Sequence, residues 1–256
     1  MKLGVLGVGD LTEKMVRGLY RSKSGIELLL APRNRERAEA LAKDVGCTLL
    51  ASNQDVVDAA DVVLIGVRPS QVAELAAQVS FTPYQALVSV VTGVPVSELT
   101  KLFGTENCSR AMLSAASEIN RSTVAVYPPD SPAEILLSSL GNVVSLNTEE
   151  HFELATVGAC MNGWFYFLFH ELEQWFVKKG LTAQQARELA FSSVEDCVAY
   201  SRHKQPTELR EIGAAIAPPG TYTAQGLEVL NGLGANAAWK TASEAVFELL
   251  TEKEPG

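Results

Sequence analysis

The sequence predicts an α/β domain built on a parallel sheet, followed by an all-helical domain. From residue 2 to about residue 147, short β-branched runs alternate with amphipathic helical stretches, the pattern of a parallel sheet flanked by helices. After residue 147 the apolar period changes to three or four residues, and no β-rich run returns. The 256 residues suffice for two domains, which we place at residues 1–147 and 148–256.

The strands of the first domain are separated by helices that begin at caps or prolines. Asn34 and Asn53 each precede a helical stretch, and Pro69 follows a strand. Strands are predicted at Lys2–Gly7, Ile26–Ala31, Thr48–Ser52, Asp61–Val67, Ala86–Val91, Asn107–Met112, Ser122–Tyr127 and Asn142–Asn147.

Glycines and prolines divide the second domain into separate helices. The segment Gly163–Phe169 is apolar all round, which predicts burial on several sides, in a core or at a subunit interface. The charged tail Thr251–Gly256 is expected to fray. Helices are predicted at Phe152–Lys179, Thr182–Arg202, Pro206–Ile216, Thr221–Leu233 and Asn236–Leu250.

Composition excludes several classes of function. The formal net charge is −9, so the surface repels nucleic acid and anionic membranes, and no basic patch offsets this. Apolar runs such as Asp61–Val67 are far shorter than the roughly 18 residues of a membrane span. The N-terminal Met1–Gly7 fits a first strand better than a signal peptide.

The cysteines point to a reducing cytoplasm. The four of them stand far apart and form no CxxC or Cys/His spacing, so we expect neither a metal site nor a disulfide framework. They are Cys47, Cys108, Cys160 and Cys197.

A glycine turn between the first strand and the first helix carries the main functional signal. Gly7 permits a tight turn, and Gly9 lets the backbone approach a pyrophosphate at the positive end of the helix near Leu11. Thr12 replaces the usual third small residue, and its hydroxyl can donate a hydrogen bond. The βαβ context favours dinucleotide binding over a plain turn without a ligand.

The end of the second predicted strand favours NADP over NAD. An NAD site usually places an acid there to bind the ribose hydroxyls, whereas a 2′-phosphate requires positive charge. After Ala31 this chain offers Arg33, Asn34 and Arg35 and no acid. The alternative is that both arginines are ordinary solvated residues of a first helical turn.

Six segments spread along nearly the whole chain carry a family pattern. They are Gly7–Thr12, Asn53, Val67–Gln71, Val88–Gly93, Arg110–Met112 and Pro219–Leu227. In order and spacing they resemble the pyrroline-5-carboxylate reductase family. The resemblance implies an α/β Rossmann-type N-terminal domain with a C-terminal all-helical dimerisation domain, in a homodimer or higher homo-oligomer. It also implies reduction of a cyclic imine to L-proline with NADPH or NADH, as in proline biosynthesis.

The resemblance further implies a set of cofactor-binding residues. Gly7 and Gly9, with Asp10 and Leu11, would hold the pyrophosphate. Asn53 would reach the adenosine ribose beside Arg33, Asn34 and Arg35. The nicotinamide would lie against Val67, Arg68 and Pro69, and Arg68 would add positive charge there or extend into solvent.

The catalytic residue implied by the resemblance is Thr223, and the phenol chemistry of Tyr222 makes it a second candidate, one that would suit a substrate other than the family's usual one. Thr223 falls on the threonine whose hydroxyl bonds the substrate nitrogen, a role compatible with capping a helix at Ala224–Leu233. Tyr222 would donate a proton or simply pack at an interface. His170 is a weaker candidate, since a lone histidine on an apolar helix is usually a buried structural residue, and His151 and His203 are expected at the surface.

Two segments depart from the family pattern. Met112–Ala116 lacks the prolines and the asparagine of the family, and Ala159–Trp164 replaces small residues with Met161, Asn162 and Trp164. In the family these segments line the cleft. The departures leave open a reductase of another imine or carbonyl compound, and a cofactor-binding protein that has lost catalysis. No Ser/His/Asp or paired-carboxylate set is needed or found, because the nicotinamide carries the chemistry.

Overall fold

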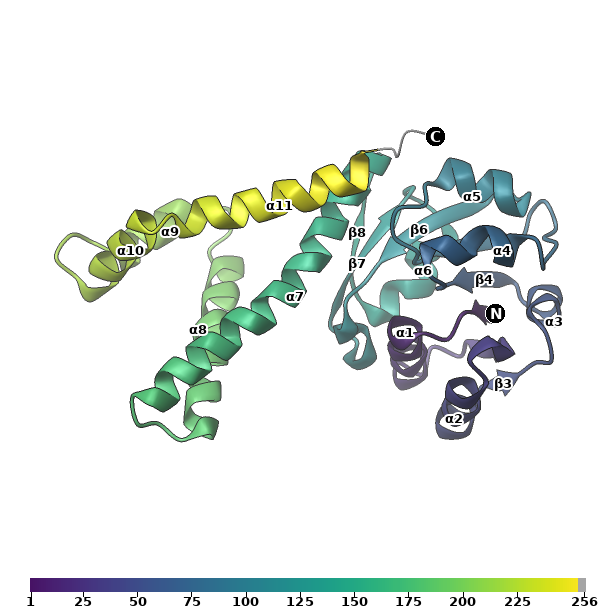
Figure 1. Cartoon of the computed structure of the whole chain (residues 1–256), viewed down its shortest axis with the longest axis horizontal. Helices are drawn as coiled ribbons and strands as arrows, with labels where there is room; N and C mark the ends of the chain where they lie inside the picture. Colours follow the sequence, from purple (N-terminus) through teal and green to yellow (C-terminus); the bar gives the residue numbers. More distant parts are fainter. Residues whose placement is uncertain (253–256) are drawn as a thin grey trace. The chain divides into compact units, whose positions relative to one another are not determined.

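The computed structural model describes residues 1–252, which form two compact units, Met1–Ala159 and residues 160–252 (Figure 1). The predicted boundary at residue 147 lies just before a continuous helix, α7 (Glu149–Lys178), whereas the division between the units falls inside that helix. The rest of the tail predicted to fray, residues 253–256, lies outside the described residues.

The first unit is a sheet with the strand order β3-β2-β1-β4-β5-β6-β7-β8. Its strands are β1 (Lys2–Leu6), β2 (Glu27–Leu30), β3 (Thr48–Leu49), β4 (Val62–Ile65), β5 (Ala86–Ser89), β6 (Cys108–Met112), β7 (Ser122–Tyr127) and β8 (Gly141–Ser145). Its helices are α1 (Asp10–Arg21), α2 (Arg35–Val45), α3 (Asn53–Ala59), α4 (Val72–Ala76), α5 (Val96–Phe103) and α6 (Pro132–Leu137), with short turns η1 (Pro32–Asn34), η2 (Pro69–Gln71), η3 (Ala115–Ile119) and η4 (Ser138–Leu140).

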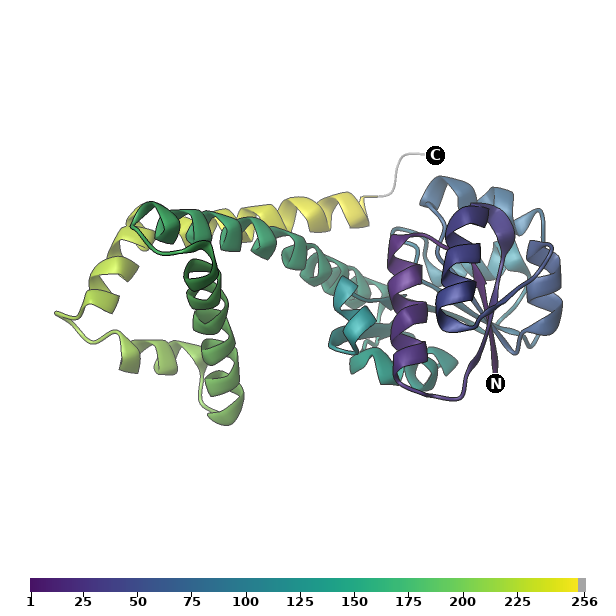
Figure 2. The same ribbon diagram turned by 90° about the horizontal axis from the view of Figure 1, so that it is seen from below.

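Both faces of the sheet are buried at β1, β2, β4 and β5, which explains why these strands are nearly continuous apolar runs. Along β4, Val62 and Leu64 belong to one hydrophobic cluster with α1, α2 and α6. Their neighbours Val63 and Ile65 belong to another with α3, α4 and α5. Helices therefore lie on both sides of the sheet, as Figures 1 and 2 show, and the switch in strand order between β1 and β4 is the place where such folds bind dinucleotides.

Two strands, β7 and β8, run against the predicted direction. β6 and β7 pair antiparallel, through partners such as Ala111 and Val126, whereas the other strand pairs are parallel. Only η3 connects β6 to β7, and a connection without a full crossover helix returns the chain in the opposite direction. Because β8 pairs parallel with β7, it is reversed as well, and the expectation of a wholly parallel sheet is wrong at these two strands.

The second unit is helical, as predicted. After α7 come α8 (Ala183–His203), α9 (Leu209–Ile216), α10 (Tyr222–Gly232) and α11 (Ala235–Thr251). Glycines mark the breaks: Gly180, Gly220 and Gly234 all have positive φ angles, which side chains disfavour. α8 starts with a capping box, in which Thr182 accepts from the backbone N–H of Gln185.

Candidate functional site

The glycine turn predicted between β1 and α1 is present, and its first glycine is required by both conformation and space. Gly7 has φ +93°. A Cβ at Gly7 would lie 2.7 Å from Cγ1 of Val67 and 3.0 Å from the backbone of Gly66. Gly9, in contrast, would place a Cβ no closer than 3.8 Å to any neighbour. The turn is thus packed at Gly7 and open at Gly9, as backbone contact with a ligand requires.

The side chain of Thr12 stabilises this turn through hydrogen bonds to both glycines. Its hydroxyl oxygen accepts the backbone N–H of Gly9 at 2.7 Å and donates to the carbonyl of Gly7 at 2.8 Å. The side chain is buried, and a Cβ at Gly66 would lie only 2.2 Å from its methyl group. The departure at Thr12 therefore supplies the expected hydrogen bond and makes the turn more rigid.

The N-terminus of α1 fits a diphosphate. The backbone N–H groups of Asp10 and Leu11 find no acceptor among residues 1–252, and they lie at the positive end of the helix. The negative carboxylate of Asp10 would repel a bound anion, but its charge is compensated by an ion pair with Lys14, one helical turn further along α1. This hydrogen bond, with the charge of Lys14, holds the pKa of Asp10 below its usual value.

The predicted adenosine end lies in the loop after β2 and at the start of α2. The guanidinium Nη2 of Arg33 lies 3.6 Å from Oε2 of Glu74 on α4. Arg35 turns along its own helix and donates from Nε to Oε1 of Glu39 at 2.7 Å. Asn34 occupies the predicted N-cap position of α2, but its side chain makes no capping hydrogen bond.

Asn53 does not cap the helix that follows it. The cap of α3 is Ser52, which accepts the backbone N–H of Asp55 at 3.1 Å. Asn53 is the first residue inside α3, and its side chain is free to donate to Oε1 of Gln78 at 2.9 Å. The expectation of an Asn53 cap was wrong because the chain turns into the helix one residue earlier.

Two residues that the sequence did not predict link these side chains. Gln78 donates to Glu74 at 3.3 Å, so Arg33, Glu74, Gln78 and Asn53 form one continuous polar network. Its members come from the β2–α2 loop, from α3 and from α4 with the turn that follows it. No local pattern marks Glu74 or Gln78, since their position depends on three elements that are distant in sequence.

The predicted nicotinamide segment follows β4, next to the glycine turn. Val67 is the side chain that a Cβ at Gly7 would meet. Pro69 begins η2, and the side chain of Gln71 accepts the backbone N–H of Arg68 at 3.3 Å. Arg68 is exposed and makes no ion pair within the part of the chain that the structure describes. The Gly7–Gly9 turn and Val67 are therefore brought together.

A buried ionic cluster joins β6 to the first turns of α7. The side chain of Arg110 is 1% exposed, and its Nη1 donates to Glu149 at 2.5 Å and to Glu153 at 2.6 Å. Its guanidinium lies 4.3 Å from the ring centre of Phe152. Glu149 also accepts the backbone N–H of Val96 at 2.7 Å. The arginine of the Arg110–Met112 segment thus anchors α7 to the sheet.

The predicted catalytic pair lies on the first turn of α10. Tyr222 and Thr223 are both exposed, Tyr222 to 92%. The helix cap is Thr221, which accepts the backbone N–H of Ala224 at 3.2 Å and donates to the carbonyl of Pro218 at 2.9 Å. Thr223 is therefore not the cap of this helix, and its hydroxyl is free of that role.

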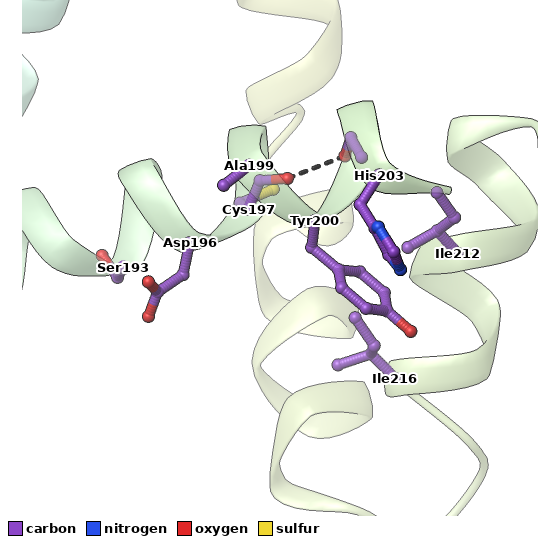
Figure 3. A pocket seen from close by; sticks show the side chains of 9 residues that line it. Ser193, Asp196, Cys197, Ala199, Tyr200, His203, Ile212 and Ile216 are labelled. Carbon is purple, nitrogen blue, oxygen red and sulfur yellow. Dashed lines mark hydrogen bonds between the residues drawn. The ribbon is translucent and has the colours of Figure 1, made fainter. Parts of the chain in front are cut away.

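A hollow of about 800 Å³ lies between α8 and α9 in the helical unit (Figure 3). Figure 3 shows the rings of Tyr200 and His203 on α8 near Ile212 and Ile216 on α9. No predicted site residue lines it. His203, His151 and His170 are all exposed, so the surface position expected of the first two is found and His170 is not the buried residue expected. Among the described residues, no group of three His, Cys, Asp or Glu side chains is placed to hold a metal ion.

Two different family models match the N-terminal and C-terminal parts of the chain. Residues 2–93 match a family model described as NADP oxidoreductase, coenzyme F420-dependent. Residues 149–252 match a model described as pyrroline-5-carboxylate reductase dimerisation. The chain belongs to the pyrroline-5-carboxylate reductase family.

Individual relatives extend over almost the whole chain. Pyrroline-5-carboxylate reductase 1 of Bacillus spizizenii is 24% identical over 252 residues, which cover 93% of this chain and 84% of the relative. The solved structure of the Streptococcus pyogenes pyrroline-5-carboxylate reductase has a TM-score of 0.86 at 23% identity and covers 98% of each chain. The Plasmodium falciparum pyrroline carboxylate reductase with NADP bound has a TM-score of 0.86 at 19% identity, with 98% and 97% coverage.

Membership of the pyrroline-5-carboxylate reductase family confirms two predictions: the fold class and the class of enzyme, an NAD(P)-dependent oxidoreductase. No helix within residues 1–252 is long and apolar enough to cross a membrane. The roles of the individual site residues stay predictions.

The two segments that depart from the family pattern differ in burial: Met112 and Leu113 of the first are buried, whereas the residues of the second are half-buried or exposed. In the first, Leu113 is buried and the backbone N–H of Ser114 donates to the hydroxyl of Ser122 at 2.9 Å. In the second, the ring of Trp164 lies 5.8 Å from that of Trp239 on α11. Trp164 thus packs within the helical unit, whereas the replacement Asn162 is exposed.

Proposed function

We propose that this protein reduces a cyclic imine with NADPH, and that its substrate is 1-pyrroline-5-carboxylate and its product L-proline. The observation that carries the proposal is the glycine turn, which leaves two helix N–H groups free for a diphosphate in a chain whose helical unit matches the reductase dimerisation model. Relatives named pyrroline-5-carboxylate reductase support the choice of substrate.

In this proposal the chain binds and orients, and the bound nicotinamide supplies the hydride for the C=N carbon. The N–H groups of Asp10 and Leu11 hold the diphosphate beside Gly7 and Gly9. Arg33, Asn34 and Arg35 face the 2′-phosphate and Asn53 faces the ribose. The segment Val67–Pro69 lies against the nicotinamide.

The hydroxyl of Thr223 donates to the substrate nitrogen in our proposal. A protonated imine is already electrophilic, so correct positioning and one polarising donor are sufficient. The capping role of Thr221 leaves Thr223 free for this contact. Tyr222 is the second candidate as a proton donor, since its phenol is exposed on the same helical turn.

The proposal is tested by following NADPH absorbance after adding 1-pyrroline-5-carboxylate to the folded protein. Thr223→Val should lower kcat/KM by about 10²-fold or more, whereas Thr223→Ser should retain most activity. Thr221→Ser is the matched control, because it keeps the helix cap. If the protein binds NADPH but gives no turnover, the proposed substrate is wrong.

A second candidate is a reductase of the same kind that acts on another imine or on a carbonyl compound. It is favoured by the Met112–Ala116 and Ala159–Trp164 segments, where Trp164 and Met161 replace small residues. A panel of cyclic imines and 2-oxo acids decides between the two, since turnover of the proline precursor alone would eliminate this candidate. NADPH binding without reduction of any compound would instead indicate a protein that has lost catalysis.

We also propose that the protein is a homo-oligomer, with a dimer as its smallest form. Large apolar side chains of the helical unit are exposed, which a stable monomer avoids. Tyr166 and Phe167, predicted to be buried in a core or at an interface, are 68% and 75% exposed, which favours the interface. Others are Leu209, Val229, Leu233 and Leu249. Light scattering after size exclusion tests this proposal, and a monomer at micromolar concentration would contradict it.

A cytoplasmic location is part of the same proposal. All four cysteines are free thiols, as expected for a reducing compartment. Fractionation of cells that express the protein, followed by detection with an antibody, tests this location.

A further inference from the structure

We propose that Glu74 on α4 sets how strongly this protein distinguishes NADP from NAD, through its ion pair with Arg33. The inference rests on the proposed cofactor site and adds to it a residue that opposes the 2′-phosphate. Arg33 is the half-buried member of the two predicted arginines, with 33% of its side chain exposed against 79% for Arg35. It is therefore the better ordered of the two cations at this end of the site.

The acid that an NAD site needs is absent from the end of β2, where Ala31 stands. The fold supplies one from elsewhere, because Oε2 of Glu74 lies 3.6 Å from Nη2 of Arg33. This distance is within an ion pair but too long for a hydrogen bond, so a competing anion displaces the pair without breaking a strong contact. A 2′-phosphate on Arg33 would feel the negative charge of Glu74, whereas a ribose 2′-hydroxyl could donate to it.

The polar network gives Glu74 a fixed place. Gln78 donates to Glu74 at 3.3 Å and accepts from Asn53 at 2.9 Å. Asn53 is the residue predicted to contact the adenosine ribose, so Glu74 is tied to both ends of the adenosine site. The hydrogen bonds through Gln78 to Asn53 involve an uncharged side chain, so they should affect the affinities for NADP and NAD equally. The charge of Glu74 should affect only the difference between these two affinities.

The experiment measures dissociation constants of 2′,5′-ADP and 5′-AMP by calorimetry on the full-length protein. These fragments lack the nicotinamide, so the result is independent of any turnover. In Glu74→Gln we expect the preference for 2′,5′-ADP over 5′-AMP to rise about three- to fivefold, the effect of an exposed ion pair. The increase should shrink at high salt, because exposed charges are screened.

Two further variants make the cause specific. Glu98→Gln on α5 removes the same charge from an exposed residue, and it should leave the preference unchanged. In an Arg33→Met background, Glu74→Gln should raise the preference less than in the wild type, because Arg33 no longer holds the 2′-phosphate beside Glu74. Gln78→Leu should weaken the binding of 2′,5′-ADP and of 5′-AMP by the same factor.

An unchanged or reduced preference in Glu74→Gln would overturn the inference, as would an equal increase in the Arg33→Met background. Failure of the wild type to bind either fragment would overturn the adenosine site itself. Fragment binding with the expected preferences but no turnover of 1-pyrroline-5-carboxylate would instead contradict the proposed function alone.

Discussion

Removal of the Arg110 guanidinium should strongly destabilise the first unit. In Arg110→Met the methionine keeps the apolar stem but leaves two carboxylates without their shared cation. The side chain of Glu153 is 9% exposed and that of Glu149 is 33% exposed. Glu149 still accepts a hydrogen bond from the backbone N–H of Val96. Most of the lost stability should therefore come from the unpaired carboxylate of Glu153.

The expected loss is about 3 kcal/mol, the low end of the roughly 3–5 kcal/mol found when one partner of a buried ion pair is removed. The low end applies because Nε and Nη2 of Arg110 have no hydrogen-bond partner among the described residues. Their removal relieves a desolvation cost that the native state carries. The second change Glu153→Gln should restore part of the loss, since it removes the stranded charge.

Urea unfolding, at a fixed protein concentration because the protein is proposed to be an oligomer, measures the free energy of unfolding. Hydrogen exchange provides a local measurement, because residues 149–157 should lose protection in Arg110→Met if the cluster holds the start of α7. A loss below about 1 kcal/mol, or no recovery on adding Glu153→Gln, would refute this account of the cluster.

Three other changes test the fold around the site. Thr12→Ala should cost about 1 kcal/mol in urea unfolding, because the glycine turn loses its side-chain hydrogen bonds, whereas Thr12→Ser should be close to wild type. Gly18→Ala should cost more than about 2 kcal/mol, since the new Cβ would lie 2.0 Å from the carbonyl oxygen of Ser117; unchanged stability would contradict this packing. Burial raises the pKa of Cys47 to about 11, so the folded state keeps a proton that the unfolded state releases, and the free energy of unfolding should fall from about pH 9 to about pH 11. Cys47→Ala should flatten this part of the pH profile.

Local patterns predicted the elements of this protein well because most of the signals are short-range. Every predicted strand and helix is found, with ends that shift by one to three residues. Shifts of three residues occur at the starts of α7 and α9 and at the end of β3, which has only Thr48–Leu49 of the predicted Thr48–Ser52. β3 is an edge strand and pairs only with β2, so fewer hydrogen bonds hold its far end.

What the sequence could not predict depends on three-dimensional arrangement. The caps were assigned to Asn53 and Thr223, but the chain enters these helices at Ser52 and Thr221. Both true caps are one or two residues away, and side-chain type alone does not distinguish them. The pairing of Arg33 with Glu74 joins residues on elements that only the folded sheet brings together.

The charges around the cofactor site explain how a protein of net charge −9 can hold a dinucleotide. Lys14 is paired with Asp10, Arg33 with Glu74 and Arg35 with Glu39, so of the cations discussed at this edge only Arg68 makes no ion pair among residues 1–252. The attraction for a diphosphate then comes chiefly from the free N–H groups at the start of α1, whose dipole acts within about one helical turn. A polyanion such as nucleic acid meets the long-range field of the whole surface and is repelled, whereas a dinucleotide needs only this short-range donor set.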